Sequence, residues 1–359
     1  MSEDERATVI VLAPTRKEFG CGVCDQTRVL VDRLREIGTP VKTVHYDGKP
    51  FTEDIGAQAG DLVFLQLSIY GYSRRGVPNW LPSVLAQLRL SRVHVVTFFH
   101  ELWVSWARIT SSAFWLSPLQ YSICRRILSN SDVAIFNAEW GYDWAARNSG
   151  AKIHYRTTFS NVGEPDKVMN WSKRENNLVV FGNVAARLNI YMALEDYARS
   201  NTDALQELQI IDIGASDHRL DKFLSRQGTL SSLARDVTVT GPLDSAAISQ
   251  ILGNSKFGLF EASWHHAGKS SVLASYRAHG VCPISIHPRN HIRGRAKFAP
   301  KPDVHFALLG NMRLESAHQS AVYAGIAAAA NQSYMRSQSI ADLLVNETSC
   351  LARIKAVLP

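Results

Sequence analysis

Residues 241–284 constrain the fold of this chain more than any other stretch. They read GPLDSAAISQILGNSKFGLFEASWHHAGKSSVLASYRAHGVCPI, in which helical patterns alternate with short apolar runs. This alternation is typical of a parallel α/β sheet with helices between its strands. The predicted elements, in order, are a turn at 241–243, a helix capped by Asp244, a strand over 257–261, a polar loop over 263–268, a helix starting near Lys269, a stop at Gly280 and a strand over 282–286.

The loop at 263–268 falls between the C-terminal end of one strand and the N-terminus of the next helix. At such a place the unpaired backbone N–H groups and the helix dipole favour an anion. A lysine and two serines in the first helical turn add a positive charge and hydroxyl donors, and two histidines and a glycine precede them. The residues expected to bind a phosphate-bearing ligand are His265, His266, Gly268, Lys269, Ser270 and Ser271.

The order and spacing of these elements resemble the donor-binding half of GT-B glycosyltransferases, close to the family 4 type. In that family this segment holds the diphosphate of a nucleotide-sugar. Family 4 enzymes usually carry two glutamates eight positions apart here, whereas this chain has Ala267 and Ser275 at those places. We favour a divergent subgroup in which Lys269 and the two histidines replace the glutamates, because polar groups remain at the loop. The alternative is a degenerate, non-catalytic copy.

The whole chain of 359 residues is long enough for about two domains. Both halves alternate β-rich runs with helical patterns, so the predicted fold class is α/β. The resemblance implies the GT-B arrangement, two Rossmann-like domains facing each other across a cleft. Residues 160–177, polar and broken by Gly and Pro, are the natural linker. The expected parts are an N-terminal acceptor-binding domain over 1–165, a nucleotide-sugar-binding domain over 172–340, and a C-terminal helix over 341–359 that returns to the first domain.

The predicted strands are short and apolar, and we expect helices to begin between them near Asp25, Pro78, Pro118 and Glu139. In the first half the strands cover 8–12, 41–45, 62–66, 93–99, 133–136 and 152–155. In the second half they cover 178–181, 209–213, 237–239, 257–261 and 282–286.

Composition describes a globular protein, with 46% hydrophobic and 20% charged residues. The acidic N-terminus is unlike a secretory signal, no stretch of 18 or more residues is apolar enough to span a membrane, and five scattered cysteines argue for a reducing compartment. A cytoplasmic location is therefore expected. The net charge of +7 is diffuse, which suits phosphate-bearing ligands but predicts no nucleic-acid partner.

Open α/β sheets bind ligands outside the carboxyl ends of their strands, which directs attention to the loops there. After the first strand, Gly20 and Gly22 permit a ligand to approach the backbone closely. This resembles the glycine-containing loop that lies near the acceptor in GT-B enzymes. A plain surface turn is the alternative. Cys21 and Cys24 form a C-x-x-C, but no second Cys/His pair completes a metal site. We therefore expect neither a metal nor a cofactor.

A second candidate loop follows the fourth strand, where His100 and Glu101 stand. Family 4 enzymes commonly keep a sugar-facing His at this place, so the resemblance makes His100 a catalytic candidate, with Glu101 as its partner or as a base on the acceptor hydroxyl. A structural His is the alternative. The preceding loop offers Tyr70, Tyr72 and Arg75, which suit sugar rings and anionic groups, although some of its aromatic residues must be core.

The third candidate loop, FGNVAARLN, follows the first strand of the second half. Its Gly-x-x-x-x-Arg pattern resembles the family loop in which Arg contacts the donor phosphates, so Gly182, Asn183 and Arg187 are expected to bind the donor. The family's following Lys is absent, and Lys269 could supply that cation from the facing loop.

Residues 109–124 carry no charge and are flanked by tryptophans and arginines. Aromatic residues bordered by arginines are typical of contact with a membrane surface or a lipid-linked acceptor. A buried loop and helix over the cleft explains the same pattern. One interpretation therefore adds peripheral contact with the inner face of a membrane. The flanking residues are Trp103, Trp106, Arg108, Arg125 and Arg126.

Taken with the resemblance, these patterns predict a hexosyltransferase-type enzyme. It would move a sugar from a nucleoside-diphosphate sugar to a hydroxyl on a glycan, a lipid-linked saccharide or a small molecule. The resemblance implies a retaining reaction without a bound metal. Two other functions stay open, a nucleotide-sugar epimerase of the same fold and a non-catalytic nucleotide-binding partner subunit.

Overall fold

The computed structural model describes residues 7–14, 22–50, 55–104, 109–201, 205–225, 234–262, 264–287, 304–311 and 317–337. The chain divides into two compact units, the first ending at Thr157 and the second running from Thr158 to Ser339. Each unit has its own six-stranded sheet, and all registered strand pairs are parallel. The predicted helix over 341–359 lies outside the described residues.

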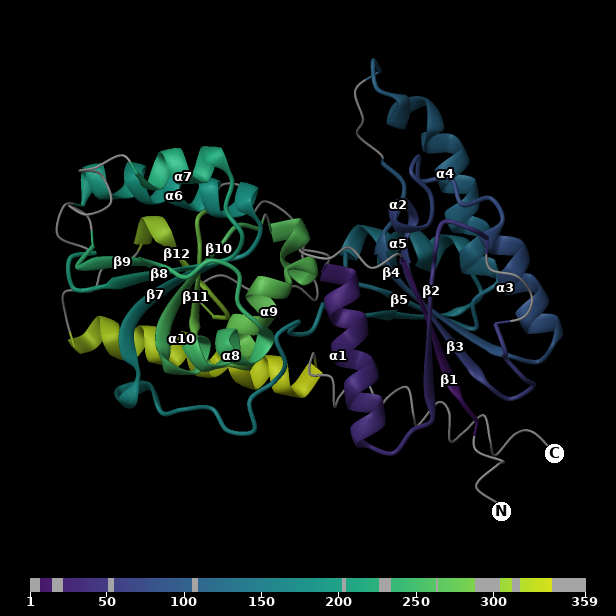
Figure 1. Cartoon of the computed structure of the whole chain (residues 1–359), viewed down its shortest axis with the longest axis horizontal. Coiled ribbons are helices and arrows are strands. Elements are labelled where there is room, and N and C mark those ends of the chain that lie inside the picture. Colours follow the sequence, from purple (N-terminus) through teal and green to yellow (C-terminus); the bar gives the residue numbers. More distant parts are fainter. Residues whose placement is uncertain are drawn as a thin grey trace. The chain divides into compact units, whose positions relative to one another are not determined.

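Unit 1 alternates strands and helices along the first part of the chain (Figure 1). Its strand order is β2-β1-β3-β4-β5-β6, so the chain reverses its direction of travel across the sheet between β1 and β3. The elements are β1 (Val9–Ala13), α1 (Gly22–Glu36), β2 (Val41–His45), β3 (Leu62–Ser68), α2 (Ile69–Tyr72), α3 (Leu81–Leu90), β4 (His94–Glu101), α4 (Ser112–Ser129), β5 (Val133–Phe136), α5 (Glu139–Asn148) and β6 (Lys152–Tyr155).

Unit 2 repeats the alternation with strand order β12-β11-β10-β7-β8-β9, and its reversal lies between β7 and β10. Its first part comprises the 3-10 helix η2 (Trp171–Lys173), β7 (Glu175–Phe181), α6 (Val184–Ser200), β8 (Gln209–Ile213), α7 (His218–Leu224) and β9 (Asp236–Val239). Its second part comprises α8 (Ser245–Asn254), β10 (Ser255–Phe260), η3 (Trp264–Lys269), α9 (Ser271–Ala278), β11 (Cys282–Ser285), β12 (Ala307–Leu308), η5 (Leu309–Asn311) and α10 (Ala317–Ser337).

The central strands are apolar because helices cover both faces of each sheet. In β7, Leu178, Val179 and Val180 are fully buried. Val179 packs with side chains of α8 and α9, whereas its two neighbours pack with α6 and α7. Figure 1 shows these two helix pairs on opposite sides of the unit 2 sheet. Alternate side chains of one strand therefore reach different helix layers, as the pleat requires.

Polar caps fix the starts of the helices that border the strand ends. Asp244 accepts from the Ala247 N–H at 2.8 Å and begins α8, as the sequence predicts. Asn183 caps α6 and Ser270 caps α9 in the same way. Gly280, with φ 66°, follows α9 at the predicted stop. These caps place the N-termini of α6 and α9 directly after β7 and η3.

A buried tyrosine hydroxyl lies at the reversal point of each sheet. In unit 1, Tyr72 Oη lies 3.0 Å from Leu12 O of β1 and 3.1 Å from Gln66 O of β3. In unit 2, Tyr276 Oη lies 3.1 Å from Val179 O of β7 and 3.0 Å from Leu259 O of β10. Each hydroxyl therefore donates its proton to a pair of strand carbonyls, and burial raises the pKa of both tyrosines.

The eleven predicted strands are all present, and their ends move by no more than three residues. The start of α4 is a correction. The sequence predicted it near Pro118, but the helix begins at Ser112 and contains Pro118. Ser111 accepts from the Phe114 N–H at 3.3 Å and so starts the helix earlier than the proline. Pro118 is exposed within the helix.

The predicted linker at 160–177 packs within unit 2. Ser160 is fully buried and its N–H donates to Tyr334 Oη at 2.8 Å. Arg174, 4% exposed, donates to Met169 O, Ser255 O and His279 O. The polar residues that suggested a linker are therefore used inside the unit, and the division between units comes earlier, after Thr157.

Candidate functional site

A pocket of about 500 Å³ opens at the carboxyl ends of β7 and β10, where the unit 2 sheet reverses. Open α/β sheets bind ligands at this point, because the helices after the two strands leave on opposite faces and a crevice remains. The lining residues come from the ends of three strands and the starts of α6 and α9. They are Phe181, Gly182, Asn183, Ala186, Ile190, Glu261, Ala262, Lys269, Ser270, Ser271, Val272 and His287.

The start of α9 forms the side of this pocket that carries a lysine and a capped helix N-terminus. Ser270 Oγ accepts from the Leu273 N–H at 3.1 Å and caps the helix. The first N–H groups of a helix have no carbonyl partner in the preceding turn. Ser271 and Val272 belong to the first turn of α9 and line the pocket. Lys269 lies half-buried at the same place. A positive side chain, a hydroxyl and a helix N-terminus therefore meet in one pocket, which suits a phosphate-bearing ligand.

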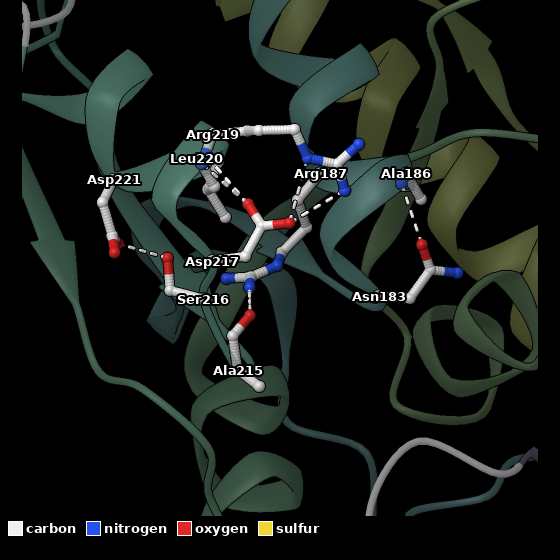
Figure 2. A network of polar contacts seen from close by, with 9 residues as sticks. All are labelled: Asn183, Ala186, Arg187, Ala215, Ser216, Asp217, Arg219, Leu220 and Asp221. Carbon is white, nitrogen blue, oxygen red and sulfur yellow. Dashed lines mark hydrogen bonds and ion pairs between the residues drawn. The ribbon is translucent and has the colours of Figure 1, made fainter.

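On the β7 side of the pocket, the backbone after the strand lies close to α9. Gly182 follows the strand with φ 137°, a conformation that favours glycine, and a Cβ there would lie 3.5 Å from Val272 Cγ2 of α9. Asn183 is exposed, and its Oδ1 accepts from the Ala186 N–H at 2.9 Å (Figure 2). The structure thus brings Gly182, Asn183 and the Lys269 segment to one pocket.

Arg187 does not face this pocket, which corrects the expected contact with donor phosphates. It is fully buried and forms an ion pair with Asp212 of β8. Its other amino group donates to Ala215 O, and Figure 2 shows the guanidinium beside Ala215, away from the Asn183 cap. Burial raises the pKa of Asp212, while Arg187 and the Tyr191 hydroxyl lower it in part. Arg187 therefore ties α6 to the end of β8 from inside the unit.

The two places that carry glutamates in family 4 enzymes are both buried here. Ala267 is 4% exposed and packs in a core cluster with residues of α8 and α9. Ser275 is fully buried, and its hydroxyl lies 2.8 Å from Ser271 O and 3.1 Å from Ser160 Oγ. A glutamate at either position would have to displace these contacts, so the substitution pattern agrees with the local packing.

The loop before α9 also holds the remaining predicted donor residues. Gly268 is buried, and its carbonyl accepts from the Thr158 N–H at 2.8 Å. The backbone of His265 and His266 belongs to η3, and their side chains lie outside the described part of the structure.

Glu261 and His287 line the pocket, although neither was among the residues expected to bind the donor. Glu261 comes directly after β10, and its Oε1 accepts from the Asn189 amide at 2.8 Å. His287 comes two residues after β11. Glu261 ends one predicted strand and His287 directly follows another, and these positions were the signal that could have identified them.

In unit 1, His100 and Glu101 end β4 with different surroundings. His100 is 6% exposed, stacks on Phe98 and lies with Nε2 2.5 Å from Gln66 Oε1. Glu101 is exposed and accepts from Ser68 Oγ at 2.5 Å. The exposed carboxylate is therefore open to a substrate, whereas one nitrogen of the imidazole is already bonded to a neighbouring strand.

The predicted acceptor-side residues of unit 1 separate into surface and core. Tyr70 is 38% exposed and its hydroxyl accepts from the Gln120 amide, whose nitrogen also donates to Arg75 O; both distances are 3.0 Å. Tyr72 is a correction, because its full burial and its bonds to two strand carbonyls make it a core residue. Gly22 begins α1, and Gly20 lies outside the described residues.

Comparison of whole structures finds chains of the same architecture. An α-glucosyltransferase in complex with UDP matches with a TM-score of 0.60 at 11% identity, covering 96% of this chain and 99% of its own. HepE from Anabaena, in complex with UDP and glucose, matches with a TM-score of 0.58 at 14% identity, covering 96% and 100%. A scan against family models and a search of curated proteins both find no match.

One further neighbour is an α-glucosyltransferase in complex with UDP and a 13-mer DNA containing a HMU base. It has a TM-score of 0.59 at 12% identity and covers 96% of this chain and 100% of its own. This neighbour conflicts with the expectation that a chain of this kind has no nucleic-acid partner, and that expectation is withdrawn. With two parallel six-stranded α/β units and GT-B glycosyltransferases as its neighbours, the chain has the GT-B fold.

Proposed function

We propose that this chain is a glycosyltransferase that moves a sugar from a nucleoside-diphosphate sugar to a hydroxyl acceptor. The observation that carries the proposal is the pocket at the unit 2 reversal point, where Lys269 and the N-terminus of α9 meet. Neighbours of the same fold in complex with UDP or UDP-glucose support this donor class. The acceptor hydroxyl belongs to a glycan, a lipid-linked saccharide or a small molecule.

The reaction breaks the bond between the anomeric carbon and the diphosphate oxygen, and the diphosphate leaves with the electron pair. Lys269 and the first-turn N–H groups of α9 would stabilise that developing charge. The acceptor oxygen forms the new bond to the anomeric carbon, and its proton passes to a carboxylate. Glu101, exposed at the end of β4, is the proposed base. Because Arg187 is buried against Asp212, it has no part in this scheme.

Since these protein groups supply positive charge at the diphosphate, we expect turnover to survive EDTA. We also propose retention at the anomeric carbon, the outcome that a resemblance to family 4 enzymes implies. The anomeric coupling in the NMR spectrum of the first-formed product checks it.

Calorimetric titration with UDP, ADP and GDP tests the donor site. Lys269→Ala should weaken binding of the preferred nucleotide by about 1–3 kcal/mol, the scale of a hydrogen bond to a charged group. Lys256→Ala is the matched control, because this lysine is the second residue of β10, at the opposite end of the strand from the pocket, and bonds Asn176 at 2.7 Å. Equal affinities in the wild type and both variants would remove the donor site from this pocket.

A nucleotide-sugar epimerase of the same fold is the second candidate, because Glu261 and His287 place a carboxylate and an imidazole in the pocket. Incubation with donor alone separates the functions. An epimerase changes the configuration of the sugar, a transferase releases it slowly to water, and a non-catalytic partner subunit binds the nucleotide and leaves the donor intact.

A further inference from the structure

The start of α4 leaves large apolar side chains in solvent. Trp115 is 69% exposed, Leu119 46% and Phe114 40%, and Ile109, in the preceding turn, is 64% exposed. The Trp115 indole N–H donates to Ile109 O at 3.0 Å, and the Phe114 ring meets the Trp115 ring edge-on. These four residues, here named the α4 tip, form one local cluster. An exposed apolar cluster of this kind marks an interaction surface.

Positive charge continues from the α4 tip along the same face of the helix. Arg126 comes eleven residues after Trp115, which is close to three full turns, so both point outward; Arg125 is exposed beside it. The helix contains no acidic residue. Between Asp61 and Asp132 the sequence has seven arginines and one acidic residue, Glu101. The face is therefore apolar at its start and cationic at its end.

A buried glutamine of α4 anchors the loop that carries two further arginines. Gln120 is fully buried; its Nε2 donates to Tyr70 Oη and Arg75 O at 3.0 Å, and its Oε1 accepts from the Val104 N–H at 3.2 Å. It thereby holds the loop with the exposed Arg74 and Arg75 against the helix. Figure 1 shows the start of α4 projecting beyond the other labelled elements of unit 1.

We propose that the outward face of α4 docks the protein on a bilayer surface rich in anionic phospholipids. Tryptophan and other apolar side chains partition into the headgroup region, and arginines beside them bind lipid phosphates. A nucleic-acid backbone would use the arginines but would leave the isoleucine, leucine and tryptophan without an apolar partner. A symmetric contact between two copies would bring like charges together. This surface is independent of the proposed sugar transfer.

Co-sedimentation of the full chain with vesicles tests the proposal. We expect binding to equal parts of phosphatidylcholine and phosphatidylglycerol, weaker binding to phosphatidylcholine alone, and loss of the difference at high salt. Trp115→Ser combined with Leu119→Ser should lower partitioning about tenfold or more. Arg125→Gln combined with Arg126→Gln should reduce the preference for anionic vesicles. Circular dichroism confirms that each variant is folded before comparison.

Two matched controls change similar side chains elsewhere on unit 1. Leu90, 78% exposed at the end of α3, and Arg147, exposed on α5, should tolerate Leu90→Ser and Arg147→Gln without any change in vesicle binding. Failure of the wild type to bind anionic vesicles overturns the proposal, as does equal loss in controls and α4 variants. Binding of the same variants to mixed-sequence duplex DNA and their sedimentation coefficients are measured as well. The proposal is also overturned if the α4 variants lose only DNA binding, or if they change the sedimentation coefficient of the protein.

Discussion

Each sheet has a buried tyrosine that bonds two strands at the reversal point, here called the lock of that sheet. The surroundings of this lock differ between the two units. Tyr72 joins carbonyls of β1 and β3, and Tyr276 joins carbonyls of β7 and β10. In unit 2 the strand ends open into a pocket with a lysine and a capped helix start. In unit 1 they carry a buried histidine and an exposed carboxylate. The shared lock belongs to the fold, and the differing strand ends agree with the proposed division of roles between the units.

The largest expected difference between the units comes from the buried ion pair in unit 2. Removing one partner leaves the other charge buried and unpaired, so Asp212→Ala should lower the free energy of unfolding by about 3–5 kcal/mol in urea titrations. Asp196→Ala is the control, because Asp196 and its partner Arg199 are 76% and 67% exposed, and it should have almost no effect. Recovery of most of the stability in the double variant Arg187→Met, Asp212→Leu would confirm the cause.

The next effect is a decrease in the free energy of unfolding at acidic pH, caused by a histidine of unit 2. Burial, with a smaller contribution from Arg174, lowers the pKa of His279 to about 4. Its Nδ1 donates to Ser275 O, and its Nε2 accepts from Ser249. The pKa of this histidine is near 6.5 in the unfolded chain and about 4 in the folded protein, so between pH 6.5 and pH 4 only the unfolded chain binds the extra proton. The free energy of unfolding is therefore complete above pH 6.5 and decreases by about 3 kcal/mol as the pH falls to 4.

Urea titrations at a series of pH values measure this loss. His279→Gln removes the titrating group, so its stability should depend much less on pH across the same window. An unchanged slope in the variant would place the acid sensitivity on other residues.

The proposed division of chemical roles predicts a smaller, kinetic effect. Glu101→Gln removes the proposed base, so turnover should fall about tenfold or more while nucleotide affinity stays unchanged. Glu261→Gln should change nucleotide affinity first, because Glu261 lines the pocket. Asp143→Asn, an exposed carboxylate of α5, is the control for charge. If Glu101→Gln weakens nucleotide binding instead, the two units do not divide their roles in this way.

The smallest effect tests the equivalence of the two locks. Tyr72→Phe and Tyr276→Phe each remove one buried hydroxyl from two carbonyls and should each cost about 1–2 kcal/mol of unfolding free energy. Circular dichroism during urea titration measures both. A cost in only one variant would limit the lock to one unit.

Sequence patterns predicted the strands well because buried parallel strands are short apolar runs with polar ends. They missed β12, whose two residues are too few to form a pattern. They started α4 late because proline is favoured in the first turn of a helix. The polar residues of 160–177 suggested a linker because sequence does not show which polar groups find buried partners.

At the candidate site, the expectation that ligand-binding loops follow strands led to Gly182, Asn183 and Lys269, and all three line one pocket because loop order determines their positions. Their part in donor binding stays a prediction. The direction of a long side chain does not follow from spacing. Arg187 stands at the expected offset from Gly182, but the buried carboxylate of Asp212 attracts it inward. Tyr72 likewise looked like a surface aromatic residue until its carbonyl partners were known.

The tight packing behind the pocket restricts how this protein can diverge. A Cβ on Gly258 of β10 would lie 2.6 Å from the Tyr276 ring, closer than non-bonded carbon atoms approach one another. A larger residue at 258 therefore requires a smaller one at 276, and losing the tyrosine also loses its bonds to two strands. In descendants of this chain we expect these two positions to change together or not at all.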